Sequence, residues 1–197
     1  MRKLVVLICG AGLAGSLLGV VGASPAQAEQ PRGNVYDSGP YNFPYKFKDK
    51  CGGLKFKVKG RAKGFETIYN VPGSGGQAFL ADNRNRYREV WTNKATGRKA
   101  YVSGKSRFRE VKATHVDGDV WRFRALISGA PFVVENDKGK VVLAEWGVLV
   151  VDTTFDTLGD SQPGGEPLDD EVVSSRGNWP TWDPDFEFCD LVHKVLG

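Results

Sequence analysis

Histidine and cysteine, which build many catalytic and metal sites, are scarce in this sequence. The chain of 197 residues contains only two histidines and three cysteines. No serine stands in a G-x-S-x-G motif, and the run VPGSGG at 71–76 matches neither glycine-rich motif that binds nucleotide phosphates. No cysteines or histidines have the spacing of zinc ligands. We therefore predict no catalytic residue, no metal ligand and no cofactor.

Long apolar runs are also absent, apart from one at the N-terminus. Arg2 and Lys3 precede an apolar stretch at residues 4–22, which is followed by Ala26-Gln27-Ala28. A basic start, an apolar middle and an A-x-A end are typical of a secretory signal peptide. We predict that residues 1–28 are removed, that no stable membrane span is left, and that the protein is extracellular or associated with the cell envelope. The alternative is an uncleaved membrane anchor, because the run is near the minimum length that spans a bilayer.

Removal of the signal peptide leaves two cysteines, Cys51 and Cys189. An even number of cysteines in an oxidising compartment predicts a disulfide. The bridge would join the first hairpin to the C-terminal segment and would close most of the mature chain.

Residues 42–60, NFPYKFKDKCGGLKFKVKG, have the pattern of a β-hairpin around Gly52-Gly53. Alternation along the strands predicts one apolar face, which consists of Phe43, Tyr45, Phe47, Cys51, Leu54, Phe56 and Val58. The opposite face, called the lysine face below, consists of Lys46, Lys48, Lys50, Lys55, Lys57 and Lys59. Like charges on neighbouring strands repel each other. The lysine face therefore stays solvated to keep an exposed strand from pairing, meets carboxylates from elsewhere in the chain, or binds an anion.

The rest of the chain alternates in short segments that end at glycine-containing turns. Strands are predicted within residues 86–92, 98–103, 107–115, 119–128, 131–136 and 141–155. A short helix is predicted after Asp183-Pro184, which supply an N-cap and a proline at the first helical position. This pattern predicts an all-β fold, an antiparallel β-sandwich or partly closed barrel of about eight strands with a short C-terminal helix.

Charge is distributed unevenly along the chain. Residues 29–114 contain 19 Lys and Arg against 7 Asp and Glu, whereas residues 115–197 contain 6 against 16. We predict a flexible N-terminal segment at residues 29–41 and a single β domain at residues 42–197, which includes an acidic loop at 157–180. The halves either form a bipolar surface or interleave and neutralise each other.

Two segments, TNKATGRK at 92–99 and FCDLVHKVLG at 188–197, carry a family resemblance. With them the chain resembles small secreted all-β proteins of actinobacteria, which share a signal peptide, an early cysteine, a T-N-x-x-T-G-[KR] turn in a meander and a late cysteine. The resemblance implies a secreted all-β fold. It brings no activity, cofactor or site residue to this chain.

These patterns favour a secreted, non-enzymatic binding module. Its lysine face would contact an anionic cell-envelope polymer or an acidic protein partner, while export and the acidic second half argue against nucleic acid. One alternative is a carrier for a small apolar ligand, with a barrel cavity lined by Trp91, Trp121 and Trp146. Another is an extracellular hydrolase that uses a carboxylate pair. Its candidate residues are Asp152, Asp156, Asp160, Glu166, Asp169, Asp170 and Glu171.

Overall fold

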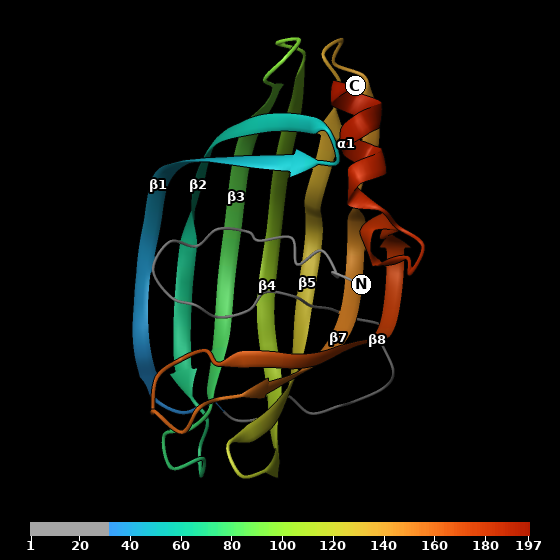
Figure 1. Cartoon of the computed structure of the whole chain (residues 1–197). Helices are drawn as coiled ribbons and strands as arrows, with labels where there is room; N and C mark the ends of the chain where they lie inside the picture. Colours follow the sequence, from blue (N-terminus) through green and yellow to red (C-terminus); the bar gives the residue numbers. More distant parts are fainter. Residues whose placement is uncertain (1–31) are drawn as a thin grey trace.

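The computed structural model describes residues 32–197 (Figure 1). The predicted signal peptide, residues 1–28, lies outside the described residues. The strands are β1 (Val35–Cys51), β2 (Leu54–Asn70), β3 (Phe79–Asn93), β4 (Lys99–Asp117), β5 (Val120–Glu135), β6 (Val141–Ala144), β7 (Trp146–Asp156) and β8 (Glu166–Asn178). A 3-10 turn (Pro180–Trp182) and the helix α1 (Phe188–Leu196) follow them.

All eight strands belong to one antiparallel sheet. Its order is β1-β2-β3-β4-β5-β7-β8, and the short β6 pairs with β5. The all-β class, the eight strands, the C-terminal helix and the disulfide are confirmed. Because β1 and β8 stand at opposite ends of the strand order and do not pair with each other, the sheet is curved but not closed.

Two hairpins cover opposite ends of the curved sheet. The tip of the β1–β2 hairpin bends across one end toward α1, and the β7–β8 hairpin crosses the other end (Figure 1). The disulfide between Cys51 and Cys189 joins the first tip to α1, with 5.1 Å between the two Cα atoms. The long strands curl around one inner face, and the outer face points to solvent.

Four clusters of buried apolar residues form the core, and the two largest lie at opposite ends of the sheet. At the α1 end, Phe56, Val58 and Trp91 pack with the buried helix residues Leu191 and Val195. At the opposite end, a second buried cluster consists of Val71, Ala78, Leu80, Ala113, Trp121, Phe123 and Phe155. Burial of these apolar side chains from both edges of the sheet stabilises its curvature.

Two segments that the sequence predicts as irregular are strands. Residues 35–41 of the predicted flexible segment belong to β1, where Tyr41 lies opposite Gly64 and the hydroxyls of Ser38 and Thr67 share a 3.1 Å hydrogen bond. Residues 166–178 of the predicted acidic loop form β8, which pairs with β7 over its length. Both are outermost strands and largely exposed. Backbone pairing holds them, so they lack the alternating apolar pattern from which strands are predicted.

Candidate functional site

The lysine face has the predicted hairpin register. Lys50 lies opposite Lys55, Lys48 opposite Lys57, and Lys46 opposite Lys59, around a turn in which Gly52 has a φ of +56°. A positive φ is cheap only for glycine, so this residue fixes the turn and the pairing that follows from it. All six lysines are exposed.

The apolar face of the same hairpin anchors it to the core, with one exception. Cys51, Phe56 and Val58 are buried, and Phe43 and Tyr45 pack against them. Phe47 is 42% exposed, although alternation predicts it on the apolar face. It lies on the outermost strand, where no further strand covers it.

None of the six lysines forms an ion pair with any of the described residues 32–197. The acidic residues of β8 lie at the far end of the strand order from β1. The second half of the chain therefore does not neutralise the lysine face. Its charges are available to solvent and to other molecules.

Positive charge continues from the lysine face across the outer face of the sheet. Alternation along β2 places Arg61 and Lys63 on the same face as Lys59. The strand register then places Arg88 opposite Arg61, and Arg86 between Lys63 and Lys105. These residues were not selected as a site from the sequence. Their signal was the alternating arginine pattern at 84–88.

The acidic residue Asp82 lies within this basic surface, and its carboxylate pairs with two arginines. Its carboxylate accepts hydrogen bonds of 2.9 and 2.7 Å from Arg107 and one of 3.3 Å from Arg32. Burial alone would raise the pKa of Asp82, but the hydrogen bonds and charges of Arg107 and Arg32 outweigh it and hold the pKa below its usual value. The carboxylate is thus ionised and directed at these partners.

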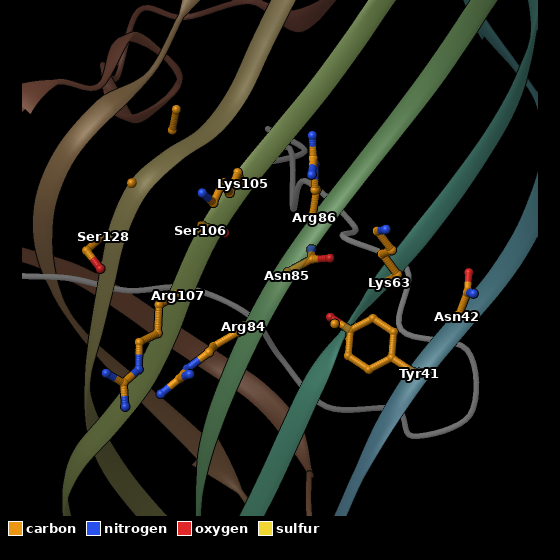
Figure 2. Close-up of a pocket in the computed structure, with 13 residues that line it drawn as sticks. Tyr41, Asn42, Lys63, Arg84, Asn85, Arg86, Lys105, Ser106, Arg107 and Ser128 are labelled. Carbon is orange, nitrogen blue, oxygen red and sulfur yellow. The ribbon is translucent and has the colours of Figure 1, made fainter.

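An open groove of about 750 Å³ crosses the basic surface (Figure 2). Two neighbouring cross-strand rows of outer-face residues line it. One contains Asn42, Lys63, Arg86, Lys105 and Ala130, and the other contains Arg84, Arg107 and Ser128. The inner-face residues between the rows are Tyr41, Gly64, Asn85, Ser106 and Gly129, which complete the lining. We call this feature the cationic groove.

The inner face holds partly buried carboxyl groups that the sequence analysis did not select. Burial raises the pKa of Glu110 to about 8, and the charge of Glu66 acts in the same direction. Burial also raises the pKa of Glu89, which accepts a 2.6 Å hydrogen bond from the Tyr45 hydroxyl and one of 2.5 Å from the indole of Trp91. Glu110 accepts a 2.7 Å hydrogen bond from the backbone N–H of Ala81. The Ala81 contact joins β3 to β4, the Tyr45 contact joins β1 to β3, and the Trp91 contact lies within β3. These contacts assign the groups a structural role.

The residues predicted for the two alternative functions are spread over the fold. Trp91 lies in the cluster beside α1, Trp121 lies in the cluster at the opposite end, and Trp146 is 58% exposed. The three tryptophans therefore do not line a common cavity.

The candidate carboxylates of the predicted hydrolase lie along β7 and β8, apart from Asp160, which lies in the connection between these strands. Asp152 forms hydrogen bonds of 2.7 and 2.6 Å with Arg124, its neighbour across the strands. Within residues 32–197 there is no group of three or more His, Cys, Asp or Glu side chains that could hold a metal ion. Helices long and apolar enough to cross a bilayer are likewise not found in that part of the chain.

Comparisons with protein-family models, curated proteins and solved structures found no match to this chain.

Proposed function

We propose that the protein is a secreted, non-enzymatic binding module whose lysine face contacts an anionic cell-envelope polymer or an acidic protein partner. The observation that carries the proposal is the arrangement of six exposed lysines in three opposed pairs, with no carboxylate among the described residues paired to them. A polyanion brought to this face would relieve the repulsion between the opposed lysines.

Protection of an exposed strand edge accounts for only half of the lysine face. Lys46, Lys48 and Lys50 lie on β1, which is an edge strand. The other three lie on β2, which is paired on both sides, with β1 and with β3. A strand without a free edge needs no lysines to prevent further pairing. The β2 lysines therefore favour a binding role.

Retention on immobilised heparin, a linear sulfated polymer, tests the proposal. In the variant, Lys46, Lys48, Lys57 and Lys59 are replaced by glutamine. The control has the same loss of charge at exposed lysines outside the lysine face, namely Lys112, Lys138, Lys140 and Lys194. We expect the lysine-face variant to elute at a clearly lower salt concentration than the control, because exposed charges act at short range in salt.

Equal elution of the two variants would show that retention depends on net charge and would contradict the proposal. The same comparison on isolated cell envelopes tests the polymer that the protein would meet after export. Loss of retention on envelopes in the lysine-face variant alone is the expected result. Unchanged retention there would count against an envelope polymer as the ligand.

A further inference from the structure

We propose that the cationic groove is a second anion site, separate from the lysine face, and that it binds consecutive phosphate groups of a linear phosphodiester polymer without bases. The site differs from the lysine face in residue type, position and shape. The experiment that tests the groove changes residues outside the lysine face, so it can fail or succeed independently of the heparin experiment.

The groove concentrates positive charge from neighbouring strands. Arg84 lies opposite Arg107, and Arg86 lies opposite Lys105. Figure 2 shows Arg84 and Arg107 extending in the same direction from β3 and β4. Neighbouring strands lie about 4.8 Å apart, and alternate residues along a strand lie about 7 Å apart. The Cα atoms of these four cationic residues therefore form a small rectangle of about these dimensions.

Most of this charge has no ion-pair partner among residues 32–197. Lys63, Arg84, Arg86 and Lys105 are exposed and form no ion pair with any residue in the described part of the chain. Arg107 is held by Asp82 through two hydrogen bonds. The pairing with Asp82 fixes the orientation of Arg107 and leaves the other four cations for a ligand.

Phosphate suits this arrangement better than carboxylate does. A carboxylate is planar and one arginine can satisfy it through two parallel hydrogen bonds. A phosphate presents acceptor oxygens in several directions, so one group can contact two cations that are adjacent across the strands, such as Arg86 and Lys105. Neutral donors, the amide of Asn42 and the hydroxyl of Ser128, also line the groove.

The length of the groove indicates a chain of such groups. It runs from Asn42 on β1 to Ser128 on β5 and so crosses four inter-strand spacings. At about 4.8 Å each, these give a length of about 19 Å. That length accommodates more than one phosphate of a linear polymer.

The lining itself offers no platform on which a base could stack, although Phe65, which is 47% exposed, lies beside Arg84 at its edge. Tyr41 is its only aromatic residue, and its ring lies against Gly64 on the inner face. The Tyr41 hydroxyl donates a 2.9 Å hydrogen bond to Asn83. Proteins that bind single-stranded nucleic acid combine cations with exposed stacking aromatics. A single exposed aromatic at the edge of the groove provides no series of stacking platforms, so the groove favours a phosphate chain joined by small polyols over nucleic acid.

Titration with inorganic tripolyphosphate, a linear chain of phosphates, tests the proposal on the purified, oxidised protein. The test variant is R84Q/R86Q, and the comparison variant is the lysine-face variant with Lys46, Lys48, Lys57 and Lys59 replaced by glutamine. We expect R84Q/R86Q to bind tripolyphosphate at least about tenfold more weakly than the wild type, because each substitution removes a charge-assisted hydrogen bond. The lysine-face variant should stay within about threefold of the wild type, since exposed charges outside the site act weakly.

Arginine side-chain N–H resonances of the wild type give a readout that requires no variant. Tripolyphosphate should shift the resonances of Arg84 and Arg86 and leave the lysine-face hairpin unchanged. Equal weakening of tripolyphosphate binding in both variants would overturn the site. Resonance shifts in the lysine-face hairpin in place of Arg84 and Arg86 would do the same. Equally tight binding of polyglutamate of the same charge would overturn the preference for phosphate. Oligothymidylate serves as the nucleic-acid probe. If it bound more tightly than tripolyphosphate, and if Phe65→Ala at the exposed Phe65 beside Arg84 weakened that binding, the groove would be a nucleic-acid site. That result would overturn the proposed ligand class.

Discussion

Lys48 lies directly opposite Lys57 on the paired strands β1 and β2. Two more lysine pairs flank it, and the hairpin tip thus collects six like charges on its solvent side. Such pairs destabilise a sheet, so the tip has to be held by contacts on its other side. Phe56 and Val58 provide them by packing in the cluster beside α1, and the Cys51–Cys189 disulfide joins the two elements covalently.

The disulfide should contribute strongly to the free energy of unfolding. It joins residues separated by 138 positions, and closing a loop of that length is worth about 5 kcal/mol in the chain-entropy model. We expect the C51S/C189S variant to lose several kcal/mol in denaturant unfolding relative to the oxidised wild type. Reduction of the wild type should produce a similar loss. A loss near zero would show that packing alone holds the hairpin tip.

Gly64 should be intolerant of a side chain, because two neighbours occupy the space. A Cβ at this position would overlap the carbonyl oxygen of Arg84 and the ring of Tyr41. We expect Gly64→Ala to lower the free energy of unfolding by about 1–3 kcal/mol, the usual range for overpacking. Gly39→Ala, where a Cβ meets nothing within 4 Å, is the matched control and should change stability little. Equal effects of the two substitutions would contradict the close packing at Gly64.

Glu110 should make stability fall as pH rises toward weakly alkaline values. Its carboxyl keeps a proton up to a pKa of about 8 in the folded protein but loses it near the ordinary value of 4.5 when unfolded. Between these values the folded state binds one more proton, so a rise in pH lowers the free energy of unfolding, by at most about 1.4 kcal/mol per pH unit. Glu110→Gln removes this group.

We therefore expect E110Q to gain stability relative to the wild type as pH rises from 5 toward 8. Denaturant unfolding at a series of pH values measures the difference. The contact with Ala81 can persist, because a glutamine carbonyl also accepts a hydrogen bond from its N–H. Parallel stability curves for the two proteins would show that Glu110 is ionised in the fold.

The hairpin could be predicted from sequence to the level of its register, because a Gly-Gly turn and strict alternation determine it locally. Strand β8 could not be predicted, because an edge strand that is held by backbone hydrogen bonds lacks the alternation of apolar and polar side chains. The disulfide could be predicted from the cysteine count together with the predicted export from the cell.

The cationic groove and Glu110 depend on which residues of different strands become neighbours. Arg84 and Arg107 belong to strands whose relative register is set by the whole meander, and sequence alternation alone gives only the face on which each lies. Glu110 stands on the inner face by the same alternation, but its burial depends on contacts from other strands. Pairing across strands was therefore the missing information.

The salt dependence of heparin binding tests the role of the lysine face most directly. In polyelectrolyte binding, the logarithm of the association constant falls linearly with the logarithm of salt concentration, and the slope reflects the number of cations engaged. Replacing Lys46, Lys48, Lys57 and Lys59 by glutamine should make this slope shallower by about three. The control at Lys112, Lys138, Lys140 and Lys194 should keep the wild-type slope. An unchanged slope in the lysine-face variant, or an equal change in both variants, would contradict the proposed role of the lysine face.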